Sequence, residues 1–172
     1  MFTMKSASRG LAAVLVLGMV ACGGAKDGGE TAGQDTSTAM APAATTAMNG
    51  ETEYTNTCSA CHQADGNGMA GQFPPLAGSD IANMASPDRM IAIVLKGLNG
   101  PVTVKGAEYN GAMAAWESVL DDEKIAAILT YERSSWGNAA SAVTAEQVAA
   151  MRTKVADRTM PWTIAELEKA VP

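Results

Sequence analysis

The chain has 172 residues, of which 12 are basic, 18 are acidic and one is a histidine, and its formal net charge is −6. A single histidine excludes a zinc site of two histidines and a glutamate, a bis-histidine haem and a row of haems, since each needs at least two imidazoles. The isoelectric point near 4.7 excludes the basic face on which nucleic-acid binding depends, so no nucleic-acid partner is expected.

The N-terminal residues have the pattern of a signal peptide. Lys5 and Arg9 precede an apolar run from Leu11 to Val20, which is too short to span a bilayer but has the length of a signal-peptide core. Residues 1–21 are therefore predicted to be a signal peptide, and the protein is expected to be exported to the periplasmic side of a bacterial membrane.

The apolar run ends in Met19-Val20-Ala21-Cys22, which resembles a bacterial lipobox, with Met19 in place of the usual leucine. In that motif the cysteine is lipidated on its sulfur and becomes the mature N-terminus. The alternative is an ordinary signal peptide cleaved near an unrelated cysteine. We expect lipidation of Cys22, and a membrane anchor there, because an exported protein seldom carries a stray thiol. Gly23 is not the aspartate that retains many lipoproteins in the inner membrane, so the outer membrane is a possible location.

The composition changes twice along the rest of the chain. Residues 22–49 are rich in glycine, alanine and threonine and have no apolar periodicity, which is typical of a disordered tether. Apolar residues then recur at regular spacing to the end. We predict a folded domain over residues 50–138 and a helical extension over residues 139–172.

The residues from Cys58 to His62 read Cys-Ser-Ala-Cys-His, the signature of covalent haem attachment. Residues three and four apart share a helix face, so Cys58, Cys61 and His62 can meet one porphyrin. The cysteines would form thioethers with the ring, and His62 would ligate the iron. A thioredoxin-like dithiol would need a βαβ context that is missing, and zinc would need the distant Cys22 as a fourth ligand. One covalent haem c is the predicted cofactor.

A helix and a hairpin are predicted after this motif. Ser86 is the expected helix N-cap with Pro87 in the first turn. The apolar residues at helical spacing are Met90, Ile91, Val94, Leu95 and Leu98. The stretch from Pro101 to Tyr109 alternates and turns at Lys105-Gly106, which predicts a small β-hairpin that shields one haem edge.

The second axial ligand of the iron must be sought among other residue types, because the chain has no second histidine. Methionine sulfur is the obvious donor. Met69 is too close to His62 in sequence to reach the opposite haem face easily. Met84 and Met90 flank the start of the predicted helix, where a methionine is more often a core residue than a ligand. Met113 lies in an irregular stretch before the last helix.

Around these motifs the chain resembles a class I cytochrome c, from about Gly50 to Asn138. The segment from Phe73 to Gly78 resembles the Pro-x-Leu-x-Gly segment of that family. The resemblance implies an all-α cytochrome c fold with a small β-hairpin near the haem edge, followed here by the helical C-terminal extension. It also implies that the Pro74 carbonyl accepts the Nδ1 hydrogen of the proximal histidine. The alternative for Pro74 is a stiff loop with no electronic role.

The resemblance further implies roles for three residues near the last helix. The family places its axial methionine where Met113 stands, although Ala114 replaces the proline that often follows, so the ligand loop is expected to be softer. Tyr109 and Trp116 would donate hydrogen bonds to the haem propionates, as aromatic residues do in similar cytochromes. The alternative is that their rings only fill the pocket.

The last family helix is predicted to begin at Asp121, with acidic residues at its positive end. In this family the N- and C-terminal helices cross, and Tyr54 and Tyr131 are the expected contact. The run from Leu129 to Asn138 looks like cytochrome subunits and fused domains that serve quinoprotein alcohol dehydrogenases or copper nitrite reductases. This likeness implies a specific redox enzyme as partner.

The extension contains two capping boxes, Thr144 with Gln147 and Thr163 with Glu166, which predict two short helices. Two interpretations of the extension stay open. It either packs across the cytochrome body or docks a partner enzyme.

These residues predict an electron carrier rather than an enzyme. An iron held by His62 and Met113 has no open coordination position, so it changes oxidation state but does not readily bind oxygen or peroxide. The expected function is to carry single electrons between membrane-associated redox partner proteins, whose identity the sequence does not reveal. One alternative is a haem c subunit of a dehydrogenase or nitrite reductase complex. Another is a haem ligand sensor or peroxidase, which would require the iron to release Met113.

Overall fold

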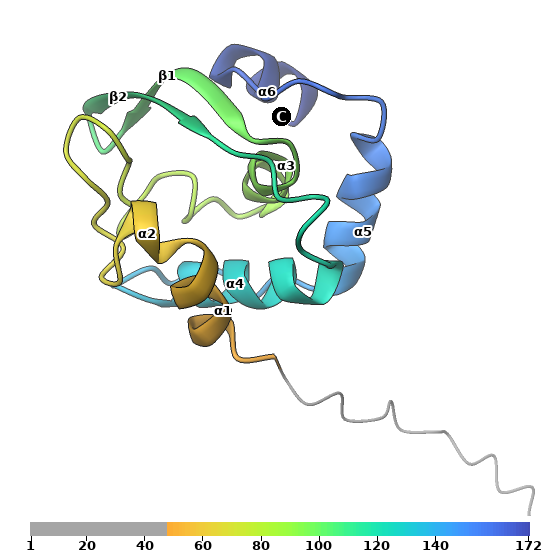
Figure 1. The fold of residues 1–172 in the computed structure, drawn as a ribbon, viewed down its shortest axis with the longest axis horizontal. Helices are drawn as coiled ribbons and strands as arrows, with labels where there is room; N and C mark the ends of the chain where they lie inside the picture. The colour runs from red at the N-terminus through yellow and green to blue at the C-terminus, as the bar shows by residue number, and fades with distance from the viewer. Residues whose placement is uncertain (1–47) are drawn as a thin grey trace, which may run out of the picture. The chain divides into compact units, whose positions relative to one another are not determined.

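The computed structural model describes residues 48–172 of the chain. The predicted signal peptide, the predicted lipidation site at Cys22 and nearly all of the predicted tether lie outside the described residues. Within the described part, the helices are α1 Gly50–Thr57, α2 Ser59–His62, α3 Asp88–Lys96, α4 Asp122–Ser134, α5 Ala145–Lys154 and α6 Ile164–Ala170, and the strands are β1 Leu98–Val104 and β2 Ala107–Met113 (Figure 1). None of the helices over residues 48–172 is long and apolar enough to cross a membrane.

Helices α1 and α4 pack against each other at one side of the domain (Figure 1). Their backbones approach so closely that a Cβ on Gly50 would lie 2.2 Å from the carbonyl oxygen of Ala127. Tyr54 is 1% exposed at this contact, and its ring centroid lies 5.4 Å from that of Tyr131. Trp136 completes the aromatic cluster at 5.0 Å from Tyr54. The predicted crossing of the two helices through Tyr54 and Tyr131 is therefore present.

Helix α3 is shorter at both ends than the sequence predicted. Pro87, not Ser86, occupies the N-cap, and the Ser86 hydroxyl accepts only a 3.3 Å bond from the Asp88 amide. The helix ends at Lys96, so the prediction that Leu98 continues it was wrong. Leu98 instead begins β1, because pairing with the opposite strand overrides the helical spacing of its side chain.

The predicted hairpin is present and its turn is at Lys105-Gly106, but its strands are longer than expected. The antiparallel register runs from Val104 opposite Ala107 to Leu98 opposite Met113. Met113 is thus the last residue of a strand and not part of an irregular stretch. The ladder extends this far because β1 buries its alternating side chains Leu98, Val102 and Val104.

The C-terminal extension packs across the body of the domain, which is the first of the two interpretations left open. Both predicted capping boxes form, at Thr144 and Thr163, and begin α5 and α6. Between these helices, Trp162 joins the edge of β1 through bonds of its amide to the Gly97 carbonyl (3.0 Å) and of its carbonyl to the Asn99 amide (2.7 Å). The extension thereby covers α3 and β1 (Figure 1).

Arg133 of α4 is fully buried and joins three segments of the fold. Its guanidinium donates to the carbonyls of Ser141 (2.8 Å), Ala82 (3.0 Å) and Met84 (3.0 Å). We expect Arg133→Ala to lower the free energy of unfolding by more than about 3 kcal/mol, because it removes a buried guanidinium and leaves one buried and two partly buried carbonyls without their charge-assisted bonds. Urea denaturation of the protein measures this. The control Lys154→Ala, on an exposed side chain, is expected to stay within about 0.5 kcal/mol of wild type; an equally small loss in Arg133→Ala would contradict the prediction.

Candidate haem site

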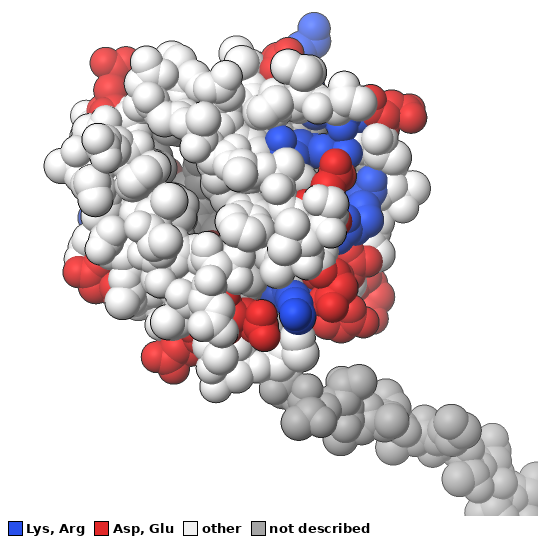
Figure 2. Space-filling model, viewed as in Figure 1, with Lys and Arg blue, Asp and Glu red and all other residues white. Residues whose placement is uncertain are grey.

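An apolar cavity of about 260 Å³ lies between α2, α3, α4, the hairpin and the loops that join them. Its aliphatic lining consists mainly of Leu76, Ile81, Ile93, Val94, Leu98, Val102, Val104, Leu120, Ile128 and Leu129. Figure 2 shows the corresponding face of the molecule, which is hollowed beside α2 and has an uncharged rim around the hollow. Such a surface excludes water and suits a large, flat, apolar group.

The Cys-x-x-Cys-His motif forms one wall of this cavity. Cys58 ends α1 and caps α2, and the His62 amide donates to the Cys58 carbonyl at 3.0 Å. The motif therefore has the predicted helical spacing from Cys58 to His62, although Cys58 itself separates α1 from α2. Both cysteines line the cavity together with His62, and burial raises the pKa of the Cys58 thiol. Two thiols and an imidazole thus face one apolar space.

The His62 ring is held by the proline loop. Its Nδ1 lies 3.0 Å from the Pro74 carbonyl oxygen. A carbonyl only accepts, so Nδ1 carries the hydrogen and the lone pair is on Nε2. Burial lowers the pKa of His62, and this effect outweighs the hydrogen bond to Pro74, which raises the pKa. The lowered pKa favours the neutral imidazole, the form that binds metals.

The glycine loop before Pro74 makes the contact between the Pro74 carbonyl and the His62 ring possible. The Gly68 amide donates to the His62 carbonyl at 2.9 Å. A Cβ on Gly68 would lie 2.3 Å from the Phe73 carbonyl oxygen. Only glycine lets the two chain segments approach this closely, and the approach places the Pro74 carbonyl beside the His62 ring.

Two methionines line the cavity, Met113 at the end of β2 and Met90 in α3. Met84 does not belong to the lining, and Met69 is 44% exposed on the surface. Met90 sits among the core residues of its helix with 6% exposure. The neighbours of Met113, over 111–114, are glycine and alanine, so Met113 carries the longest side chain that this segment contributes to the lining.

Tyr109 and Trp116 also line the cavity, from β2 and from the loop after it. Tyr109 is buried opposite Val102 in the hairpin, and the Trp116 amide donates to the Val94 carbonyl at 2.9 Å. Both rings are therefore held in the cavity wall. Their predicted bonds to haem propionates stay predictions.

Glu132 is a cavity residue that the sequence reasoning missed. It is 4% exposed and lines the cavity from α4, and burial raises the pKa of its carboxyl to about 8. The spacing of α4 contained a signal for this position. Glu132 follows Ile128 by four residues and Leu129 by three, so it falls on the buried face of the helix.

Asn138 is a second missed residue, and it ties together two segments that line the cavity. Its Oδ1 accepts from the amide of Gly78 (2.8 Å) and from Nδ2 of Asn83 (2.7 Å). Its Nδ2 donates to the carbonyls of Leu76 (3.0 Å) and Glu132 (2.7 Å). One side chain thus ties the end of α4 to the loop that supplies the cavity residue Leu76.

Comparison with known proteins assigns the family. Residues 45–131 match the family described as cytochrome c oxidase, cbb3-type, subunit III. Cytochrome c-552 of Thermus thermophilus is 40% identical over 105 residues, which cover 56% of this chain and 79% of that protein. The chain belongs to the c-type cytochromes. It is an electron-transfer protein that binds haem c covalently, and the two thiols, the neutral imidazole and the methionine sulfur of the cavity fit that group.

Other relatives of this cytochrome are subunits of larger dehydrogenases. The alcohol dehydrogenase (quinone) cytochrome c subunit of Gluconacetobacter polyoxogenes is 32% identical over 126 residues, covering 73% of this chain and 27% of that subunit. The gluconate 2-dehydrogenase cytochrome c subunit of Pantoea cypripedii is 37% identical over 105 residues, covering 60% of this chain and 24% of that subunit. The likeness to alcohol dehydrogenase cytochrome subunits, predicted from the run from Leu129 to Asn138, is confirmed.

Proposed function

We propose that this cytochrome carries single electrons between membrane-associated redox proteins, with its iron held between His62 and Met113, and that it has no catalytic activity of its own. The observation that carries the proposal is the cavity lining. One apolar space holds the two cysteines of the attachment motif, a neutral histidine and a methionine sulfur. When bound, haem c supplies a centre that gains and loses one electron.

Different residues of the chain set the relative stability of the oxidised and reduced states of that centre. The Pro74 carbonyl orients His62 and strengthens it as a donor through the 3.0 Å contact to Nδ1. Thioether donation from Met113 favours the reduced state relative to a second imidazole. The aliphatic walls exclude water and disfavour the extra positive charge of the oxidised state. Two protein donors leave no position for oxygen or peroxide.

The surface around the cavity suits short-lived contacts with a partner. Its rim carries no charged side chains in the face shown in Figure 2. A small uncharged rim supports weak, replaceable docking, as electron carriers need. Tyr109 and Trp116 would hold the haem propionates from the hairpin side.

A second candidate function is supported by the dehydrogenase relatives. The chain covers 24–27% of the cytochrome subunits of the Pantoea gluconate 2-dehydrogenase and the Gluconacetobacter alcohol dehydrogenase. A haem c subunit of a dehydrogenase complex would copurify with a partner in fixed ratio after mild solubilisation. A carrier would elute alone.

Export and anchoring form a separate part of the proposal, and both rest on the sequence. Cleavage before Cys22 and lipidation of its sulfur would keep the cytochrome on the periplasmic side of a membrane, with the outer membrane possible. We expect Cys22→Ser to release the haem-loaded protein from the membrane fraction, and the mature N-terminal peptide of wild type to carry the mass of its lipids. Wild type recovered in the soluble fraction would contradict the anchor.

The carrier proposal is tested by a potentiometric titration of the haem-loaded protein. We expect one haem per chain and a single one-electron wave, with the same spectra in both directions. A matched Cys61→Ala variant is expected to keep the wave while holding the haem by one thioether. Turnover of peroxide by wild type at the rate of a haem enzyme, or a second wave, would contradict the proposal.

A further inference from the structure

The segment from Ala114 to Asp121 connects Met113 to α4 and forms part of the cavity wall through Trp116 and Leu120. Because Met113 immediately precedes this segment, the position of its sulfur depends on how firmly the segment is held. Alanine at position 114 does not restrict the backbone as a proline would. The rigidity of this ligand loop, residues 114–121, must therefore come from contacts with the rest of the fold.

Backbone bonds to α3 hold only residues 116 and 117 of the ligand loop, while the amides of Val119 and Leu120 bond within the loop to the Trp116 carbonyl at 3.0 and 2.9 Å. The amide of Trp116 donates to the Val94 carbonyl at 2.9 Å, and that of Glu117 donates to the Leu95 carbonyl at 3.3 Å. The Glu117 carboxylate also pairs with Lys96, whose Nζ lies 2.6 Å from Oε2 and whose side chain is 6% exposed. These contacts attach the loop to α3.

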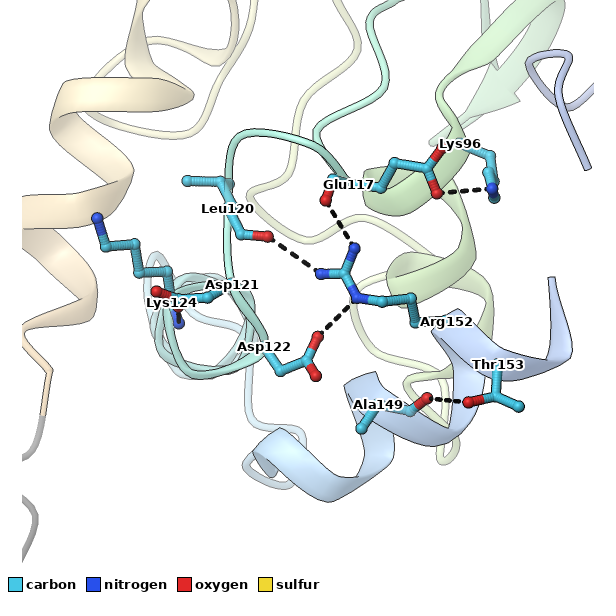
Figure 3. Close-up of polar contacts among 9 residues, drawn as sticks. All are labelled: Lys96, Glu117, Leu120, Asp121, Asp122, Lys124, Ala149, Arg152 and Thr153. Carbon is cyan, nitrogen blue, oxygen red and sulfur yellow. Dashed lines mark hydrogen bonds and ion pairs between the residues drawn. The ribbon is translucent and has the colours of Figure 1, made fainter. Parts of the chain in front are cut away.

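Besides the burial of Leu120 in the core, a further polar attachment of the later part of the loop comes from Arg152 of α5 (Figure 3). Its Nη1 donates to the Glu117 carbonyl (2.7 Å) and its Nη2 to the Leu120 carbonyl (3.0 Å), while Nε pairs with Asp122 Oδ1 (2.9 Å). One planar fork thus binds the middle and the end of the ligand loop and the first residue of α4. A lysine could not reproduce three contacts of this fixed geometry.

Arg152 lies outside residues 45–131, the part of the chain that matches the cytochrome family. The C-terminal extension therefore contributes a contact to the loop next to the iron ligand. We propose that Arg152 is a positioning residue for the iron: it holds the ligand loop closed so that Met113 stays coordinated. This inference rests on the proposed role of Met113 as axial ligand.

The hold of Arg152 on the ligand loop should set how readily an external ligand replaces Met113. An external ligand can bind the ferric iron only when the loop opens and Met113 leaves. The apparent affinity of that ligand is proportional to the open fraction, so it rises by the factor by which a variant favours opening. Loss of charge-assisted bonds to two loop carbonyls is expected to favour opening by about tenfold or more.

The experiment measures imidazole binding to the ferric, haem-loaded protein for wild type, Arg152→Ala, Arg152→Lys and the control Arg158→Ala. Arg158 is another arginine of the extension, but it pairs with Glu166 and stacks on Trp162, away from the ligand loop. Imidazole affinity should rise about tenfold or more in Arg152→Ala, less in Arg152→Lys, and not in the control. The midpoint potential and the intensity of the methionine-to-iron charge-transfer band should decrease most in Arg152→Ala, less in Arg152→Lys and not in Arg158→Ala.

Unchanged imidazole affinity in Arg152→Ala, with a circular dichroism spectrum that shows the folded protein, would overturn the inference. If Arg152→Ala does not fold, Arg152→Lys decides, since a wild-type affinity there would show that the three-contact fork is not needed. Failure of the proposed function looks different. In that case wild type itself lacks the methionine-to-iron band.

Discussion

Replacing Met113 by alanine in the haem-loaded protein is expected to open the iron. The reduced variant should bind carbon monoxide, which wild type excludes while Met113 stays bound. The methionine-to-iron charge-transfer band should vanish, and the midpoint potential should fall because the thioether, which favours the reduced iron, is lost. Optical titration with carbon monoxide and a redox titration measure these changes.

Met90→Leu is the matched control for this prediction, because Met90 is the other methionine in the cavity wall. Leucine keeps the apolar volume and removes the sulfur. We expect Met90→Leu to retain the band and to exclude carbon monoxide as wild type does. The reverse pattern, with the band lost in Met90→Leu and kept in Met113→Ala, would show that Met90 of α3 is the axial ligand.

The stability of this cytochrome is expected to decrease as the pH rises from about 4.5 to about 8, through the titration of Glu132. Burial raises the pKa of its carboxyl to about 8, so the folded protein holds a proton that the unfolded chain has already released over that range. The stabilisation is fully present below pH 4.5 and is lost as the pH rises through 8. The slope can reach about 1.4 kcal/mol for each pH unit.

Glu132→Gln tests this because glutamine keeps the shape and cannot ionise. The variant should show a flatter pH dependence and exceed the stability of wild type at alkaline pH by about 2 kcal/mol or more in urea denaturation. Glu123→Gln, on an exposed residue of the same helix, should follow wild type throughout. Parallel pH profiles for wild type and Glu132→Gln would contradict the prediction.

The ionised carboxylate should also act on the redox centre. Glu132 lines the cavity, and a negative charge there stabilises the oxidised state more than the reduced state. The midpoint potential of wild type is therefore expected to fall as the pH rises through 8, and Glu132→Gln should remove this dependence.

Local sequence patterns predicted those parts of the fold that neighbouring residues determine. The capping boxes at Thr144 and Thr163, the turn at Lys105-Gly106 and the start of α4 after Asp121 all follow from side chains within a few positions of each other. The attachment motif also lies within one short segment. Each of these patterns encodes a contact that forms without help from the rest of the chain.

The parts that depend on distant contacts could not be predicted in the same way. Leu98 has helical spacing but is taken into a strand by pairing with Met113, and the extension then adds Trp162 to the same edge. Arg133 and Arg152 read as ordinary surface charges in sequence. Their roles come from carbonyls brought to them by folding, between 8 and 51 residues away for Arg133 and between 32 and 35 residues away for Arg152.

The most direct test of the account is the absorption spectrum of the wild-type haem-loaded protein, oxidised and reduced, with and without carbon monoxide. A carrier whose iron is closed between His62 and Met113 should be low-spin in both states, should show the methionine-to-iron charge-transfer band when oxidised, and should not respond to carbon monoxide when reduced. A high-spin ferric spectrum, or a carbon monoxide shift in the unmutated protein, would contradict the account and show that the iron binds external ligands.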